Sequence, residues 1–302
     1  MTAPDRWCAA FPGREAVSKG LDSSFYKDCR RAKLVFEEAG DYFATDMAGI
    51  CYFQNDIQTQ WVTICLVTHC YAVYSVAAER YGLPVALAGY SQGEFTACAA
   101  SGAVSFTDIL GLIYRLERIL EATKTEDECM YRLVDIDIGL LEKCCEEIDH
   151  TGANIKVSAY ISDAQNIISG ERDCVEKAIA LAKKHGARWA IDLNCDRAYH
   201  SPLCREAAEK ARWHFGNIAL SEAKIPVYSC YDGEKSRHSA GIVNKLSKQI
   251  DNPIRWKKII KNLITDGVTR LVEPGPGCTV SANSRISDER MNCVWIGSVN
   301  DL

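Results

Sequence analysis

Hydrophobic and polar positions divide the first 122 residues into a few apolar stretches separated by short breaks. The longest covers residues 58–81, contains neither proline nor glycine, and predicts a mostly buried helix that ends near Gly82. No run of about 18 uniformly apolar residues predicts a membrane-spanning helix. The other elements expected here are strands at 9–11 and 85–88, the first stopped by a Pro-Gly turn, and helices at 94–100 and 106–122.

After Ala122 the pattern changes to shorter elements, which follow a polar and charged segment at 123–128. An order of β-α-β-β-α-β within about 65 residues is typical of a ferredoxin-like unit. We therefore expect a ferredoxin-like subdomain at 125–191, inserted into a larger α/β domain made of residues 1–124 and 192–302. The supporting elements are strands at 130–137, 155–160, 166–169, 188–193, 226–228 and 270–272, and helices at 139–148, 174–185, 203–212 and 254–265.

The composition of the chain argues against several classes of protein but does not identify its function. The chain has 302 residues, of which 47% are hydrophobic and 25% charged, and its net charge of −5 argues against nucleic-acid binding. Its 15 cysteines are scattered without a C-x-x-C pair, so we expect free thiols in a reducing, cytoplasmic setting. This pattern predicts neither a disulfide framework nor a metal site. No apolar stretch near the N-terminus predicts a signal peptide.

The segment GYSQGE at residues 89–94 is the strongest chemical signal in the chain. A serine between two glycines, after a strand and before a helix, is typical of a nucleophile elbow. The glycines keep side chains away from the crowded turn, and the serine oxygen then projects into a cleft. The backbone N–H of Gln92, at the start of the new helix, is placed to donate to an oxyanion beside Ser91. We therefore predict that Ser91 is a nucleophile.

A serine nucleophile needs a general base, and His200 is the best placed of the six histidines. It follows a predicted strand and precedes a helix that Ser201 can cap, with Pro202 in its first turn. Sites in open α/β sheets gather at such strand ends. Taken by itself, His200 also fits a solvated loop histidine.

Several motifs together resemble one enzyme family. GYSQGE resembles a G-H-S-x-G-E motif, YHSPL at 199–203 resembles F-H-S-P-L, and FPGR at 11–14 resembles the start of F-P-G-Q-G. The segments TQ at 59–60, NPIRW at 252–256 and VEPGPG at 272–277 resemble further blocks in the same order. The chain thus resembles the malonyl-CoA:acyl carrier protein transacylase family, which includes discrete, trans-acting polyketide synthase acyltransferases. The resemblance implies an α/β-hydrolase-like large domain with a parallel sheet core, and a cleft between it and the ferredoxin-like subdomain.

The resemblance also implies a mechanism and a partner. Ser91 would take an acyl group from a thioester, His200 would act as base, and the main-chain carbonyl of Gln249 would orient the imidazole. The N–H groups of Gln92 and Arg14 would form the oxyanion hole. The acyl group would pass in a ping-pong reaction to the phosphopantetheine thiol of an acyl carrier protein. No cofactor or metal is implied, and a monomer is expected.

The acyl pocket departs from the family pattern. Malonyl-transferring members bind the free carboxylate with an arginine, and an ungapped alignment places Leu116 at that position, with Arg115 beside it. A buried malonyl carboxylate would then lack a partner, which is costly. Ile161 replaces a family asparagine, and Tyr199 precedes the base where malonyl-selective members have phenylalanine. With Gln60, these residues are assigned to the acyl pocket, and an arginine at position 116 is expected to favour malonyl loading.

Alternatives stay open at this point. Arg14 or Arg197 could supply a relocated carboxylate clamp for malonyl. Without such a clamp, the acyl-enzyme could pass an uncharged or aminoacyl group to a carrier protein, or water could hydrolyse it. A docking subunit with an inactive site is disfavoured by the intact Ser91, His200 and Gln249.

A basic segment is a candidate surface for the acidic carrier protein. The residues that form it are Arg255, Lys257, Lys258 and Lys261 on the predicted helix at 254–265. An ordinary solvated helix face explains the same charges equally simply.

Overall fold

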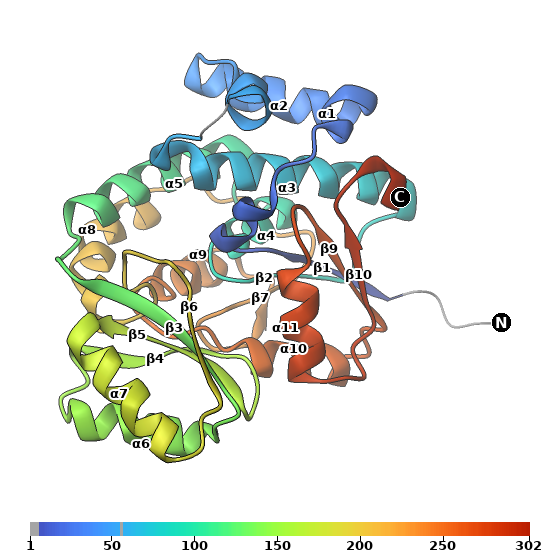
Figure 1. Cartoon of the computed structure of the whole chain (residues 1–302). Coiled ribbons are helices and arrows are strands. Elements are labelled where there is room, and N and C mark those ends of the chain that lie inside the picture. The colour runs from blue at the N-terminus through green and yellow to red at the C-terminus, as the bar shows by residue number, and fades with distance from the viewer. Residues whose placement is uncertain (1–5, 55–56) are drawn as a thin grey trace.

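A computed structural model describes residues 6–54 and 57–302, which form a large domain and a small subdomain, each built on its own sheet (Figure 1). The large sheet has six strands in the order β10-β9-β1-β2-β7-β8. All neighbouring strands pair in parallel except β7 and β8, which are antiparallel. The strands are β1 (Trp7–Phe11), β2 (Ala86–Gly89), β7 (Val227–Tyr228), β8 (Lys235–Ser236), β9 (Arg270–Pro274) and β10 (Cys293–Ile296).

The register of β1 and β2 positions the candidate site. The two strands pair in parallel with Phe11 opposite Gly89, the last residue of each strand. The carboxyl ends of parallel strands lie at one edge of a sheet, where open α/β proteins place their sites. The loop after Phe11 and the turn that carries Ser91 therefore leave the sheet side by side, and the Tyr90 N–H donates to the Phe11 carbonyl at 2.9 Å.

Helices cover both faces of the large sheet, and α3 (Thr59–Tyr81) is the longest. It is long and apolar enough to cross a membrane, but 72% of its most apolar window is buried within the protein. Here α3 is a core helix, as the sequence predicts. The other α-helices of this domain are α1 (Ser24–Asp28), α2 (Arg30–Phe43), α4 (Gly93–Ser101), α5 (Phe106–Ala122), α8 (Arg205–Gly216), α9 (Ser239–Lys248), α10 (Trp256–Thr265) and α11 (Thr279–Ser287).

The small subdomain has an antiparallel sheet in the order β4-β5-β3-β6, covered on one face by two helices (Figure 1). Its elements are β3 (Glu128–Val134), α6 (Ile138–Ile148), β4 (Ile155–Tyr160), β5 (Gln165–Glu171), α7 (Arg172–Lys184) and β6 (Trp189–Asp192). The predicted strand at 130–137 ends earlier, because Asp135 has a φ of 60° and Asp137 caps α6 through the Leu140 N–H. The subdomain joins the large domain through a bridge between Ala159 and Ile254.

Candidate active site

Ser91 lies on the tight turn between β2 and α4. Its φ of 54° is left-handed, a conformation that is costly for a residue with a side chain. The two neighbouring glycines make the turn possible. A Cβ atom on Gly89 would lie 2.1 Å from the Gly93 carbonyl carbon, and one on Gly93 would lie 2.2 Å from the Phe11 carbonyl oxygen. The structure therefore has the elbow geometry that the motif predicts.

His200 and Gln249 lie next to Ser91, although they are far from it in the sequence. The Ser91 Oγ is 2.7 Å from the His200 Nε2, and the His200 Nδ1 is 2.7 Å from the Gln249 carbonyl oxygen. The carbonyl can only accept, so Nδ1 carries the hydrogen and Nε2 is free to accept the serine proton. Gln249 is at the C-terminal end of α9, and its backbone oxygen orients the imidazole. This arrangement is a Ser–His dyad oriented by a main-chain carbonyl.

Burial keeps the His200 imidazole neutral. The side chain is 8% exposed, and desolvation lowers its pKa to about 4, against a smaller opposing effect of the hydrogen bond to Gln249. A neutral imidazole is the form that can take a proton from Ser91 at pH 7.

The pKa of His200 predicts the acid limb of the acylation reaction. Protonation removes the Nε2 lone pair, so the rate of Ser91 acylation should stay level from pH 8 to about 5. It should then fall about tenfold per pH unit below the pKa near 4. Rapid-quench intact mass spectrometry with an activated ester would measure this, with circular dichroism at each pH as control for unfolding. An acid limb centred near 6.5 would mean that His200 is solvated in the free enzyme.

The two residues predicted to form the oxyanion hole both lie at helix starts. Gln92 caps α4, and Arg14 begins the short 3-10 helix Arg14–Lys19, so both amides lie at helix starts, where no preceding helical carbonyl accepts from them. The strand register brings their loops together beside Ser91. The helix dipole of α4 adds positive potential at the same point.

Two adjoining cavities lie beside the dyad. Ser91 and His200 line one of about 530 Å³, together with residues of β3 and β5 from the small subdomain. A second cavity of about 610 Å³ lies toward α3 and α5 and is lined by Gln60 and Glu117 among others. Arg14, Asp196 and Tyr199 line both, so the two adjoin and form one cleft, of which the Ser91 cavity lies between the subdomain and the large domain. Gln60 lines the second cavity and Tyr199 lines both, and their assignment to the acyl pocket stays a prediction.

Glu117 is the main site residue that the sequence analysis misses. Its carboxylate accepts from the Arg14 guanidinium at 2.8 Å, from the Thr63 hydroxyl at 2.6 Å and from the Gln92 side-chain amide at 3.1 Å. The Glu117 side chain is only 10% exposed. A carboxylate and its paired arginine therefore stand beside the residue that follows the nucleophile. The acid at 117 was visible in the sequence, but it carries no family motif.

The structure places Leu116 and Ile161 away from the cleft. Leu116 is 7% exposed and packs in the large core on the buried face of α5, and Ile161 is fully buried between the subdomain and α10. Neither lines either cavity. Arg115 is exposed on the surface of α5, also outside both. Of these two neighbours on α5, Glu117 reaches the cleft and Leu116 does not, because one position along a helix turns a side chain by about 100°.

Arg197 is unavailable as a relocated clamp. Its side chain is 2% exposed, pairs with Glu128 at 3.5 Å and donates to the Leu120 carbonyl at 3.0 Å. Arg14 remains as the arginine of the clamp alternative, but it is already bound to Glu117.

Comparisons with known proteins agree with this geometry. Residues 57–284 match the acyl transferase domain family, which is well over half of the chain. The chain belongs to this family. A curated relative, the malonyl CoA-acyl carrier protein transacylase of Bacillus subtilis (strain 168), is 29% identical over 291 residues, 95% of this chain and 92% of its own. The Escherichia coli (strain K12) protein of the same name is 26% identical over 272 residues, 88% of each chain.

Solved structures show that the acyltransferase fold is shared. The malonyl CoA-acyl carrier protein transacylase from Coxiella burnetii has a TM-score of 0.93 at 22% identity, covering 99% of this chain and 96% of its own. A malonyl-transacylase in complex with a type II PKS acyl-carrier protein has a TM-score of 0.91 at 22% identity, covering 98% and 97%. The predicted fold class, a parallel-sheet α/β domain with a small antiparallel subdomain, is confirmed.

The basic segment on α10 of this acyltransferase is largely paired. Lys257 forms an ion pair with Asp163, Lys258 pairs with Glu234 at 2.8 Å, and Arg255 lies 4.2 Å from the centre of the Tyr160 ring. Lys261 is exposed. The predicted docking face is therefore less positive than its sequence indicates.

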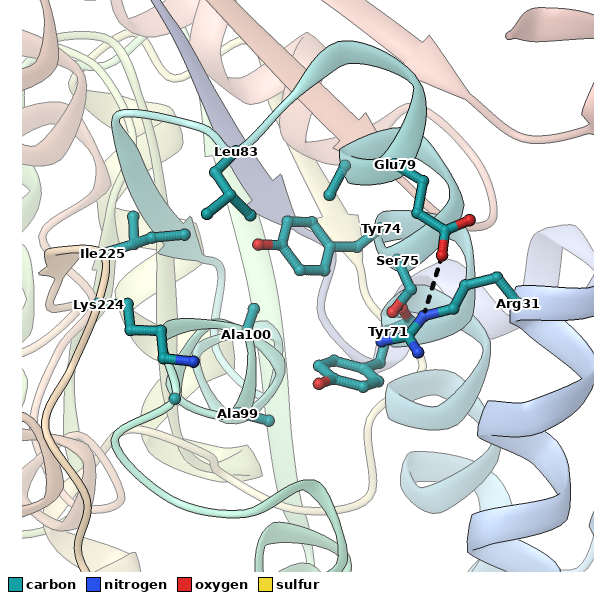
Figure 2. A pocket seen from close by; sticks show the side chains of 12 residues that line it. Arg31, Tyr71, Tyr74, Ser75, Glu79, Leu83, Ala99, Ala100, Lys224 and Ile225 are labelled. Atoms are coloured by element: carbon teal, nitrogen blue, oxygen red, sulfur yellow. Dashed lines mark hydrogen bonds and ion pairs between the residues drawn. The ribbon is translucent and has the colours of Figure 1, made fainter.

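A further cavity of about 360 Å³ lies outside the acyltransferase cleft (Figure 2). It is bounded by α2, α3, α4 and residues 224–225, with Tyr71 and Tyr74 between Lys224 on one side and the Arg31–Glu79 pair on the other. Its serine, Ser75, donates to the carbonyl of its own helix. No residue assigned to catalysis lines it.

No metal site is formed by the part of the acyltransferase that the structure describes. Among residues 6–54 and 57–302, no group of three or more His, Cys, Asp or Glu side chains is arranged to hold an ion. All 15 cysteines lie in these ranges and are free, and most are buried. Buried thiols behave as small apolar core residues.

Proposed function

We propose that this chain is a serine acyltransferase that moves an acyl group without a free carboxylate between carrier-protein or CoA thioesters, through an acyl-enzyme on Ser91. The observation that carries the proposal is the chain of two 2.7 Å contacts from Ser91 to His200 to the Gln249 carbonyl. Membership of the acyl transferase family supports the reaction class.

The geometry supports a ping-pong sequence. The Ser91 Oγ attacks the thioester carbonyl while the His200 Nε2 takes its proton. The N–H groups of Gln92 and Arg14 stabilise the oxyanion. The C–S bond then breaks, and the departing thiolate receives the proton from His200. In the second half, His200 takes a proton from the incoming thiol, whose sulfur attacks the Ser91 ester, and the serine oxygen recovers that proton as it leaves.

The pair formed by Glu117 and Arg14 supports an acyl group without a carboxylate. The pair is neutral overall, and each partner satisfies the other at 2.8 Å. A malonyl carboxylate would have to share Arg14 with Glu117 and would be repelled by the latter. An uncharged acyl group, or one with an ammonium group, avoids this cost. The names of the curated relatives favour the malonyl alternative, in which Arg14 serves both carboxylates.

An acyl carrier protein is the proposed partner, as the names of the curated relatives indicate. A place in polyketide-type specialised metabolism is proposed from the resemblance to trans-acting acyltransferases. The phosphopantetheine arm on the carrier would supply the thiol, so no separate cofactor is proposed. The buried free cysteines support a reducing, cytoplasmic setting.

Intact-protein mass spectrometry with malonyl, acetyl, longer acyl and aminoacyl thioesters tests the acyl preference. We expect adducts with groups lacking a carboxylate and little with malonyl. The Glu117→Gln variant should raise the malonyl adduct severalfold relative to acetyl, because it frees Arg14 and removes the repelling charge. Thr63→Val is the matched control, since it removes one partner of Glu117 but leaves both charges.

Each outcome of this test separates the candidates. A strong malonyl adduct on the unaltered chain would overturn the acyl preference and support a malonyl transacylase that uses Arg14. Adducts discharged only by a carrier-protein thiol support transfer. Free acid released without a lasting adduct would make the chain a thioester hydrolase.

A further inference from the structure

Arg132 projects from the small subdomain into the cleft. It is two residues after Met130 on β3, so both side chains lie on the same face of the sheet, and both line the cavity that contains Ser91. Arg132 also lines a neighbouring cavity of about 600 Å³, between the start of α11 and residues 295–301. Its half-buried side chain therefore stands where the Ser91 cavity and this second space meet.

The guanidinium of Arg132 lacks the close carboxylate that Arg14 and Lys124 of the cleft have. Arg14 is paired with Glu117, and Lys124 with Asp196. In the described part of the chain, the hydrogen bond found for Arg132 runs to a neutral group, the Asn283 Oδ1 at 3.1 Å.

The acids around Arg132 do not replace such a partner. Glu15 attracts Arg132 only from a longer range, and the described residues show no ion pair or hydrogen bond between the two. In the neighbouring cavity, Asp22 accepts from the Ser24 N–H and Asp301 from the Ser298 N–H. Glu273 is held at the start of α11 by the N–H groups of residues 280 and 281. The positive charge of Arg132 is therefore not neutralised by a directly bonded carboxylate, and it can attract an anionic ligand.

Two neutral polar groups lie close to Arg132. The Tyr90 hydroxyl and the Asn283 side-chain amide nitrogen are buried and find no partner among the described residues. Both can donate, and the amide nitrogen can only donate. These atoms are closed off from solvent, so a ligand would contact Arg132 and not them. A half-buried guanidinium among donors is a setting that favours an oxyanion.

We propose that Arg132 binds an anionic oxygen group of the thioester substrate. This deepens the proposed function and rests on it, since the anion belongs to the molecule that acylates Ser91. The phosphate of the phosphopantetheine arm carries the required chemistry on such a substrate. A carboxylate on the acyl group is the second source of the same chemistry, and its binding by Arg132 would overturn the acyl preference proposed above. The neighbouring cavity offers room for the part of the substrate beyond Arg132.

Equilibrium binding tests the proposal without turnover. Isothermal titration calorimetry would compare Ser91→Ala with Ser91→Ala/Arg132→Gln for pantetheine, phosphopantetheine and malonyl-pantetheine. We expect the Kd for an anionic ligand to rise about tenfold or more on loss of the charge, a factor typical of a charge-assisted hydrogen bond. The Kd for pantetheine, which carries no anion, should stay the same. Ser91→Ala/Asn283→Ala is the matched control, because it removes the neutral partner and leaves the cation.

The changes in Kd across the three ligands show which part of the substrate carries the anion, and they also test the proposal. A loss confined to phosphopantetheine assigns the phosphate, and one confined to malonyl-pantetheine assigns the acyl carboxylate. Equal losses of affinity for all three ligands would overturn the proposal, because Arg132 would then only hold the subdomain in place. Unchanged affinity for every ligand would overturn it as well. Failure of the proposed function would show separately, as the absence of a Ser91 adduct on the unaltered chain.

Discussion

The Ser91→Ala variant should form no acyl-enzyme with any thioester, and its transfer rate should fall by about 10³-fold or more. The serine oxygen, 2.7 Å from the His200 Nε2, is the nucleophile that the cleft presents, and alanine offers no lone pair to replace it. The fold should persist, because alanine adopts the strained φ of 54° at about the same cost as serine. Intact mass spectrometry and thermal unfolding measure the two effects.

A distant serine provides the matched control for this experiment. Ser75 lines the cavity in Figure 2 and donates to the Tyr71 carbonyl, so Ser75→Ala should load acyl groups like the unaltered chain. An adduct that survives on Ser91→Ala, and that peptide mapping places elsewhere, would refute the assignment of the nucleophile.

The Leu116→Arg variant should destabilise the fold and gain no malonyl loading. Leu116 is 7% exposed in the core between α5 and the rest of the large domain. A guanidinium there has no acid partner on the buried face of the helix, and burying an unpaired charge costs about 3 kcal/mol or more in measured cases. Denaturant unfolding would measure the loss, and intact mass spectrometry the loading.

The volume-conserving variant Leu116→Met separates charge from packing. This variant should lower the free energy of unfolding by less than about 1.5 kcal/mol, because methionine fills a similar space without a charge. A stable Leu116→Arg protein that acquires a malonyl adduct would show that position 116 reaches the cleft after all.

This prediction reverses the one that the sequence supports, and the cause is local geometry. Counting 25 residues from Ser91 identifies Leu116 (116 − 91 = 25), but an ungapped count does not set the rotation of α5 against the sheet. Packing of the apolar stripe that contains Leu116 turns that residue inward. The contacts to Arg14, Thr63 and Gln92 then draw Glu117 to the cleft.

Several helices and strands carry too little local signal to be predicted. Strand β8 has two residues, and α9 and α11 mix small, polar and apolar residues in short segments. Strand β7 is as short, but it is predicted from the sequence at 226–228. Such elements form because the neighbouring sheet and helices complete their hydrogen bonds and cover their apolar sides. By contrast, α5 has a long apolar stripe and a Ser105 cap, and its observed bounds equal the predicted ones.

Features that depend on contacts within a few residues could be predicted from the sequence. The Gly-x-Ser-x-Gly turn, the long apolar helix at 59–81 and the β-α-β-β-α-β order of the subdomain all follow from local sterics and periodicity. Tertiary structure alone decided which distant groups meet. The pairing of Arg14 with Glu117, 103 residues apart, and the position of Arg132 between two cavities depend on how strands and helices pack. No local sequence pattern predicts these contacts between distant residues, because each contact depends on the rotation and register of whole helices and strands.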